Sequence, residues 1–267
     1  MTDIELRILT QKVISISKEV GAFLKNEVHQ IKGKDIQEKG LHDLVTYVDK
    51  TAERSLVSSL EDLLPNAGFI TEEGTVDQTE SDYKWIIDPL DGTTNFIHGV
   101  PLYSVSIALW HSNEIILGVI YEPNLNECFS SWKGGDAILN GKKISVSGTS
   151  KVDKALFATG FPYYDYSLMK EYLLFFEYLM KNSRGIRRLG SAAVDMAYVA
   201  CGRYDGFYEY GLQAWDIAAG SIIVKNAGGK VFDFEGSDHY IFGKEIVALN
   251  TELHIEFMDQ IRIHFGK

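Results

Sequence analysis

Residues 85–99, WIIDPLDGTTNFIHG, place two aspartates directly after an apolar run, and this arrangement restricts what the chain can fold into. The run of aromatic and branched apolar residues predicts a buried strand. Asp88 and Asp91 then lie at the end of that strand. A buried carboxylate costs several kcal/mol unless a cation compensates its charge. The fold must therefore bring a cationic group or a bound cation to these two side chains.

The residues that follow the aspartates add donors for an anion. Pro89 stiffens the backbone and cannot donate to a strand ladder, so the two carboxylates can project from a turn toward one point. Residues 92–94, Gly-Thr-Thr, are typical of a helix start, where free N–H groups and hydroxyls bind anions such as phosphate. A divalent metal would neutralise the carboxylates and polarise that phosphate. Taken alone, the same residues are equally consistent with ordinary turn and helix capping.

Further acidic residues fall at the ends of other predicted elements. Glu72 ends the strand before residue 85, Asp49 lies near the start of a predicted helix, and Asp216 starts another helix after a strand that ends near Glu209. Each has a structural explanation of its own. Glu72 can be a solvated loop charge, Asp49 a first-turn acid and Asp216 a helix N-cap. Together with the aspartate pair, they predict one shared acidic site.

Composition narrows the class of protein. The chain of 267 residues has a net charge of −11, which argues against nucleic acids and anionic membranes as main partners and suits binding of divalent cations. The N-terminus lacks the apolar region of a signal peptide, and no window reaches the roughly 18 apolar residues of a membrane helix. The two cysteines, Cys128 and Cys201, lie far apart, so we expect reduced, inert thiols in a cytoplasmic protein.

The first half of the sequence predicts two helices and a largely antiparallel sheet. Apolar residues at steps of three and four predict an amphipathic N-terminal helix; they are Leu6, Leu9, Val13, Ile16, Val20 and Phe23. Residues 32–43 are predicted to be a mobile loop, and a helix follows until Pro65 stops it. Strands are predicted over 67–74 and 83–88. Residues 105–147 are rich in β-formers, with a hairpin at Asn140-Gly141.

The second half alternates between strands and helices. The predicted strands cover 155–161, 204–210, 230–234 and 245–250, and the predicted helices cover 166–182, 191–203, 215–229 and 251–265. No repeat and no linker-like tract interrupts the chain. We therefore predict a layered α+β fold, with a single domain over 1–267 whose two lobes, approximately 1–150 and 151–267, fold as one unit.

Paired motifs resemble the inositol monophosphatase family. WIIDPLDGTTNFIHGVP is similar to the first signature of that family, and WDIAAGSIIVKNAGG is similar to the second. Further family segments occur in the same order along the chain, namely DLVTYVD, FITEEG, GGDAILNGKKISVS, TGFP and LGSAAVDMAYVACG. The resemblance implies an α-β-α-β-α sandwich of the sugar phosphatase type, a homodimer, a Mg²⁺ cofactor and inhibition by lithium.

The resemblance also implies which residues bind metal. One Mg²⁺ would be held by Glu72, Asp88 and the backbone carbonyl of Leu90. A second would be held by Asp88, Asp91 and Asp216, and a third, weaker site would use Glu72 and water. An all-oxygen set of this kind suits Mg²⁺, which keeps several of its waters.

The remaining roles concern water and substrate. Thr93 and Asp49 would pair beside the nucleophilic water, so that Glu72, Thr93 and Asp49 form the catalytic set. The amides of Gly92 and Thr93 would contact phosphate, and Ser191, Ala192 and Glu209 would line the polyol side. The full substrate-binding set is Asp91, Gly92, Thr93, Ser191, Ala192, Glu209 and Asp216. Lys39 matches a loop lysine that approaches the site in the family.

The substrate is expected to be a small phosphate monoester. The nucleotidase branch of the family more often has a lysine and a glutamate where this chain has TTNF after DPLDG, so the sequence favours inositol 1-phosphate. Fructose-1,6-bisphosphatase, histidinol phosphatase and nucleotide 3′-phosphatase activities stay open as alternatives. Some bacterial relatives also act as interaction proteins in ribosomal RNA transcription complexes, which leaves a binding role open. A catalytically dead member is disfavoured because none of the matched ligands is missing.

Overall fold

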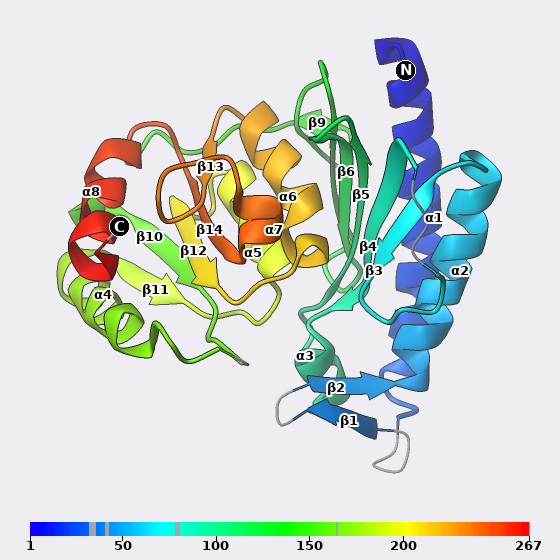
Figure 1. The fold of residues 1–267 in the computed structure, drawn as a ribbon, viewed down its shortest axis with the longest axis horizontal. Helices are drawn as coiled ribbons and strands as arrows, with labels where there is room; N and C mark the ends of the chain where they lie inside the picture. Colours follow the sequence, from blue (N-terminus) through cyan, green and yellow to red (C-terminus); the bar gives the residue numbers. More distant parts are fainter. Residues whose placement is uncertain (32–35, 41–42, 78–80, 164, 267) are drawn as a thin grey trace.

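A computed structural model describes residues 1–31, 36–40, 43–77, 81–163 and 165–266, with the side chains of 36–40 and 43–44 left out. The fold consists of five layers, in which helices and sheets alternate (Figure 1). Two N-terminal helices cover one face of a seven-stranded sheet. Two further helices separate that sheet from a five-stranded sheet, and a last helix pair covers the outside. The predicted α+β sandwich is therefore confirmed.

The seven-stranded sheet has the order β3-β4-β5-β6-β7-β8-β9. Its strands are β3 (Gly68–Thr71), β4 (Tyr83–Asp91), β5 (Ser104–His111), β6 (Glu114–Glu122), β7 (Glu127–Trp132), β8 (Ile138–Leu139) and β9 (Lys142–Lys143). β3 and β4 are parallel, and the later neighbours are antiparallel. Asn140 and Gly141 have φ of 47° and 80°, so both residues of the predicted hairpin adopt the left-handed conformation that this turn requires.

The two N-terminal helices, α1 (Asp3–Glu27) and α2 (Tyr47–Leu63), pack on the outer face of this sheet. Their apolar stripes join Trp85, Ile87 and Leu90 of β4 in one buried cluster. A short hairpin of β1 (Ile36–Gly40) and β2 (Asp43–Thr46) precedes α2. Part of the segment predicted to be a loop is therefore a strand pair, and α2 begins later than the sequence indicated.

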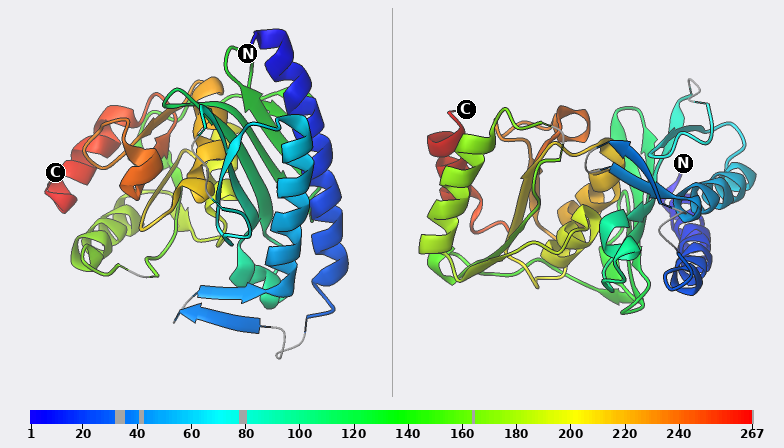
Figure 2. Two further views of the ribbon diagram at one scale, coloured as in Figure 1. Left: turned by 45° about the vertical axis from the view of Figure 1, so that its right-hand side comes forward. Right: turned by 90° about the horizontal axis from the view of Figure 1, so that it is seen from below.

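The two central helices, α5 (Ala192–Ala200) and α6 (Ala214–Asn226), lie between the sheets, as the views of Figure 2 also show. They are rich in alanine and other small residues, so they pack closely on each other and on β5 and β6. Ile86 of β4 belongs to this central cluster, whereas its neighbours Trp85 and Ile87 face the outer helices. Successive side chains of β4 therefore alternate between the two faces of the sheet.

The five-stranded sheet has the order β11-β10-β12-β14-β13. Its strands are β10 (Leu156–Thr159), β11 (Gly185–Arg187), β12 (Gly206–Tyr210), β13 (Lys230–Phe232) and β14 (Glu245–Leu249). The outermost helices, α4 (Met169–Asn182) and α8 (His254–Phe265), bury aromatic residues against it. Short helices are α3 (Thr93–Ile97), η2 (Val152–Lys154) and α7 (Tyr240–Gly243).

Three short elements, β11, η2 and α7, were not predicted from the sequence, because segments of three or four residues carry too few positions for a periodic pattern. Among the described residues, none of the helices combines the length and the apolar character needed to cross a membrane.

Candidate metal and active site

The end of β4 differs from the sequence prediction and explains how two aspartates come together. The predicted strand ended at Asp88 with a turn after it, but β4 continues to Asp91. Asp88 pairs with Ser106 and Asp91 with Ser104, so the register shifts between the two aspartates. Side chains three positions apart in a regular strand point to opposite faces. One extra residue forms a β-bulge, which turns both carboxylates to the same face of the sheet.

That face is the one covered by α5 and α6. The Ser106 hydroxyl donates to the backbone oxygen of Trp215 at 3.1 Å, and the Ser104 hydroxyl lies 3.3 Å from that of Ser191. Trp215 belongs to the first turn of α6, and Ser191 is the N-cap of α5. The bulged strand and the starts of both central helices therefore meet at one place.

Gly92 and Thr93 connect β4 to α3. Gly92 has a φ of 99°, and a Cβ there would lie 3.1 Å from the backbone oxygen of Gly190, so the turn requires glycine. The Thr93 hydroxyl lies 3.0 Å from the Leu90 carbonyl oxygen and 3.3 Å from Asp49 Oδ1. The predicted contact between Thr93 and Asp49 is thus present in the structure.

Asp49 comes from the first turn of α2 and is completely buried. Its Oδ2 accepts hydrogen bonds from the Thr46 amide at 2.8 Å and the Thr46 hydroxyl at 2.7 Å. Burial raises the pKa of Asp49 above its ordinary value, although these hydrogen bonds oppose the shift. Asp49 lies behind Thr93 and is absent from the residues that line the pocket described below.

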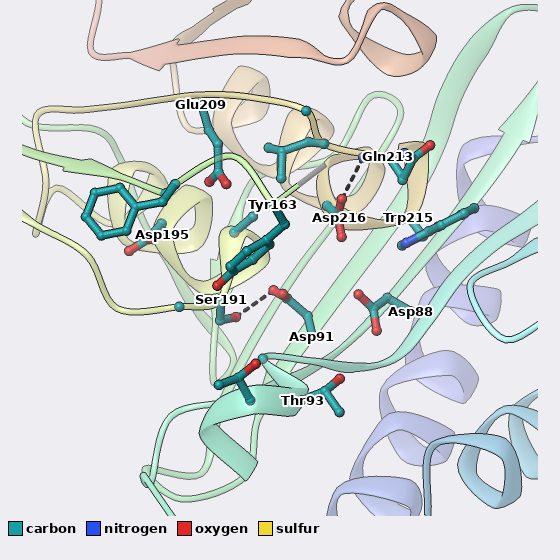
Figure 3. Close-up of a pocket in the computed structure, with 18 of the residues that line it drawn as sticks. Asp88, Asp91, Thr93, Tyr163, Ser191, Asp195, Glu209, Gln213, Trp215 and Asp216 are labelled. Atoms are coloured by element: carbon teal, nitrogen blue, oxygen red, sulfur yellow. Dashed lines mark hydrogen bonds between the residues drawn. The ribbon is translucent and has the colours of Figure 1, made fainter. Parts of the chain in front are cut away.

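Asp216 comes from the first turn of α6, where its Oδ2 accepts from the Gln213 amide at 2.6 Å. Oxygens of Asp88, Asp91 and Asp216 all lie within 4.8 Å of one another, and Figure 3 shows the three side chains converging. Burial, followed by the charge of Asp91, raises the pKa of Asp216 to about 7. Carboxylates this close repel one another, so the cluster favours either protons or a bound cation.

Asp91 is held in place by the start of α5. Its Oδ2 accepts from the Ser191 hydroxyl at 2.6 Å and from the Ala193 amide at 2.8 Å. Burial raises the pKa of Asp91 to about 6, and these donors limit the rise. Ser191, expected on the polyol side, therefore orients a carboxylate of the acidic cluster as well.

Glu72 completes the acidic group from the end of β3. Its Oε2 is inaccessible to solvent and has no hydrogen-bond partner among the described residues, and Glu72 and Asp88 line the same pocket. Burial raises the pKa of both groups well above their usual values, and the charge of Glu72 raises that of Asp88 further. An unpartnered buried oxygen beside three converging carboxylates fits an oxygen-liganded divalent cation such as Mg²⁺.

The cluster forms one wall of a pocket of about 440 Å³. Among the described residues, its ionisable lining consists of Glu72, Asp88, Asp91, Arg188, Asp195, Glu209 and Asp216, together with Tyr163 and Tyr210. Leu90, Gly92, Thr93, Ser191 and Ala192 also line it. The pocket therefore contains every predicted site residue except Asp49, which reaches it through Thr93. The side chain of Lys39 lies outside the described part of the structure.

Glu209 and Asp195 lie on the opposite wall, on β12 and α5. A Cβ on Gly160 would lie 2.0 Å from Glu209 Oε1, so this carboxyl group packs directly on a glycine backbone. Asp195 is 1% exposed, and its Oδ1 has no hydrogen-bond partner in the part of the chain that the structure describes. Burial raises the pKa of both groups well above their ordinary values.

Arg188 and Asp195 are pocket residues that sequence reasoning missed. The Arg188 guanidinium lies over the rings of Phe161 and Tyr163 and is the cation that faces the acids within the described lining. A signal existed for Asp195, because it is a charged residue inside the apolar helix AAVDMAYVA. Arg188 lay in an irregular segment, where no periodic pattern indicates which way a side chain points.

Comparisons with known proteins agree with this geometry. The chain is 40% identical over 253 residues to a Pseudomonas aeruginosa protein named Nus factor SuhB, covering 93% of each chain. It is 39% identical to an inositol-1-monophosphatase of Mesorhizobium japonicum, covering 95% of this chain and 96% of that one. The crystal structure of the extragenic suppressor protein suhB from Bartonella henselae superposes with a TM-score of 0.91 at 36% identity, covering 96% and 98% of the two chains. The sequence model of the inositol monophosphatase family matches residues 5–263, and the chain belongs to that family.

Proposed function

We propose that this chain hydrolyses inositol 1-phosphate to inositol and phosphate with Mg²⁺ as cofactor. The observation that carries the proposal is the convergence of Asp88, Asp91 and Asp216 within 4.8 Å, next to the unpartnered oxygen of Glu72. Ionised carboxylates at this separation are tolerable only when cations lie between them. A pocket of about 440 Å³ in front of them is large enough for a small polyol phosphate.

Three metal positions are proposed, two main positions and one weaker position. Glu72, Asp88 and the Leu90 carbonyl would hold one ion, and Asp88, Asp91 and Asp216 would hold the other, with Glu72 and water contributing to a weaker third position. Bound in this way, Mg²⁺ supplies an activated water and neutralises the charge that develops on phosphate and on the leaving oxygen.

Thr93 and Asp49 are proposed to handle the proton of the attacking water. The Thr93 hydroxyl can accept that proton while it donates its own to Asp49, which lies 3.3 Å away. The raised pKa of Asp49 supports this role, because it makes the carboxylate a stronger base than a solvated aspartate. Thr46 keeps the other oxygen of Asp49 in a fixed position.

Substrate binding is divided between phosphate and alcohol. The amides of Gly92 and Thr93 are proposed to contact phosphate. On the polyol side, Glu209 is proposed to bind a ring hydroxyl, with Ser191 and Ala192 beside it. Since the Ser191 hydroxyl already donates to Asp91, we expect its effect on substrate binding to be mainly indirect.

A panel assay tests the proposed substrate. Phosphate release would be measured at fixed Mg²⁺ from inositol 1-phosphate, fructose 1,6-bisphosphate, histidinol phosphate and adenosine 3′,5′-bisphosphate. We expect the largest kcat/KM for inositol 1-phosphate, with lithium inhibiting the reaction. A larger kcat/KM for any other compound would replace the proposed substrate, and the absence of release from all four would remove the phosphatase proposal.

A second candidate function follows from the name of one relative. A protein 40% identical to this chain is named Nus factor SuhB, so an interaction role in a transcription complex is a separate proposal for this chain. A pull-down with the wild-type chain and an Asp216→Asn variant would test it. Recovery of RNA polymerase or transcription factors with both proteins would support a binding role independent of catalysis. If neither protein recovers RNA polymerase or transcription factors, the binding role would be rejected and the phosphatase proposal would remain.

We also propose that the chain forms a homodimer, and the support for this proposal is membership of the family alone. Light scattering of the purified chain measures its mass, and a value of 30.0 kDa would identify a monomer and contradict it. A cytoplasmic location stays a prediction.

A further inference from the structure

A second buried carboxylate on α2 lies one helical turn after Asp49 and contacts a different part of the site. Glu53 is completely buried. Residues four apart lie on the same face of a helix, so Asp49 and Glu53 both point from α2 toward the sheet and its loops. Asp49 contacts Thr93, whereas Glu53 contacts the segment that follows Glu72.

Glu53 binds that segment with both of its oxygens. Its Oε2 accepts from the Glu73 amide and its Oε1 from the Thr75 amide, each at 2.7 Å. Between them, the Gly74 amide donates to the Thr71 hydroxyl at 3.2 Å. Three successive backbone amides after Glu72 are therefore held by side chains.

This arrangement places Glu72 between two fixed points. On one side, β3 pairs with β4 up to Thr71. On the other side, two charge-assisted hydrogen bonds attach residues 73 and 75 to α2. Glu72 lines the same pocket as Asp88, Asp91 and Asp216. Like charges at close range repel one another, so an unrestrained loop would turn the Glu72 carboxylate away from the cluster.

We propose that Glu53 is a positioning residue for the metal site, which holds the Glu72 carboxylate where a divalent cation can use it. The inference depends on the proposed function, because it assumes that Glu72 is a metal ligand. It adds a residue that lies outside the pocket and touches neither substrate nor metal. Groups that orient metal ligands typically affect metal affinity by about 10–100-fold when they are replaced.

Glu53→Gln is the direct test. Glutamine keeps the shape but replaces one acceptor oxygen by an NH₂ group, which cannot accept from a backbone amide. We expect the dissociation constant for Mn²⁺, used as a probe in place of Mg²⁺ and measured by calorimetry, to rise about 10–100-fold. Hydrogen exchange of the Glu73 and Thr75 amides should become faster.

Glu122→Gln provides a matched control. Glu122 is another completely buried glutamate, and it accepts from the amides of Asn124 and Leu125 at 3.0 and 2.6 Å. It lies outside the pocket lining. We expect this variant to lose comparable stability while its Mn²⁺ affinity stays at the wild-type value. An equal loss of affinity in both variants would assign the Glu53 effect to general destabilisation.

A double-mutant cycle with Glu72→Gln distinguishes positioning from an independent effect. If Glu53 acts through Glu72, then Glu53→Gln should not weaken Mn²⁺ binding further once Glu72 is replaced. Additive losses would overturn the inference. A wild-type chain that binds no Mn²⁺ would instead remove the proposed function, so the two failures are distinguishable.

If Glu53→Gln does not fold, the same measurements can be made on Thr71→Val. Valine keeps the branched shape and removes the acceptor for the Gly74 amide. We expect faster exchange of that amide and a smaller decrease in Mn²⁺ affinity. Faster exchange with unchanged affinity would show that the loop does not position Glu72 and would overturn the inference.

Discussion

Helices α2 and α6 begin in the same way and yet contribute differently to the site. Each starts with a capping box whose third helical residue is an aspartate, Asp49 after Thr46 in α2 and Asp216 after Gln213 in α6. In both, the aspartate accepts from the backbone amide of its N-cap residue. By local sequence and local geometry, the two aspartates are equivalent helix caps.

Their remaining contacts differ. Asp49 accepts from the Thr46 hydroxyl as well, and its other oxygen lies near the Thr93 hydroxyl. Asp216 has the Gln213 amide on one oxygen and lies within 4.8 Å of Asp88 and Asp91. A carboxylate whose oxygens already contact hydroxyls suits proton transfer, whereas one that faces other carboxylates suits a cation. The same capping motif therefore supplies a carboxylate suited to proton transfer in α2 and one suited to cation binding in α6. The tertiary contacts of each aspartate determine the difference.

The largest expected effect is that of Asp216→Asn. Loss of one charged ligand should reduce kcat/KM about 10³-fold, equivalent to about 4 kcal/mol of transition-state stabilisation. The increase in melting temperature on adding Mg²⁺ should also become smaller, because binding to the native state alone stabilises it. Steady-state kinetics and thermal melts with and without Mg²⁺ measure both effects. A kcat/KM within tenfold of wild type would exclude Asp216 as a ligand.

Asp49→Asn should affect catalysis without affecting metal binding. Asparagine still caps the helix but is a poor base, so we expect kcat to fall about 100-fold. The weaker capping contacts should reduce the free energy of unfolding by about 1 kcal/mol. The Mg²⁺-induced increase in melting temperature should match that of wild type. A loss of that increase would mean that Asp49 contributes to the metal site, and the distinction between the two helices would fail.

The pH dependence of stability should distinguish the two chemical states of the cluster. The folded-state pKa of Asp216, about 7, and that of Asp91, about 6, both exceed the usual aspartate value of about 4. The folded state therefore binds more protons than the unfolded state, and stability without metal should fall as pH rises from about 4 to 7. We expect a loss of about 5 kcal/mol by denaturant unfolding in EDTA.

Two comparisons sharpen this prediction. Asp216→Asn should reduce the fall, because one of the titrating groups is removed. Saturating Mg²⁺ should abolish it, because the cation stabilises the ionised carboxylates. A stability that rises with pH in EDTA would contradict the assignment of raised pKa values to the cluster.

The smallest effect is expected at a third capping box. Thr2 and Glu5 form the same motif at the start of α1, on the exposed surface. Glu5→Gln should leave kcat/KM unchanged and should shift the melting temperature less than Asp49→Asn does. Phosphate release and thermal melts provide the measurement. A loss of activity in Glu5→Gln would show that replacing a capping residue by itself disturbs the fold. The effects of replacing Asp49 and Asp216 could then not be assigned to catalysis or metal binding.

The sequence predicted most of the fold because its long elements have clear periods. The apolar positions of α1 and α4 and the Asn140-Gly141 turn were sufficient signals, since they depend on neighbours close in sequence. The β1–β2 hairpin was missed because its segment contains two glycines and mixed charges, which are typical of a loop. The two segments nevertheless pair as antiparallel strands.

For the site, sequence reasoning identified the acids at element ends but did not determine how they are held. The contact between Glu53 and the Glu73 amide spans 20 residues, and the contact between Asp91 and Ser191 spans 100. No local pattern indicates hydrogen bonds over such separations. Arg188 was missed for the same reason, since its position depends on packing against Phe161 and Tyr163.

The β-bulge in β4 makes the length of the DPLD segment more important than its composition. Removing Pro89 would leave Asp88 and Asp91 two positions apart, which is the spacing that a regular strand needs to keep both on one face. The acids would then remain neighbours, while Leu90 would return to the ordinary pairing of the sheet and its carbonyl would turn away from the pocket. A shortened chain of this kind would separate what the carboxylates contribute from what a single backbone oxygen adds.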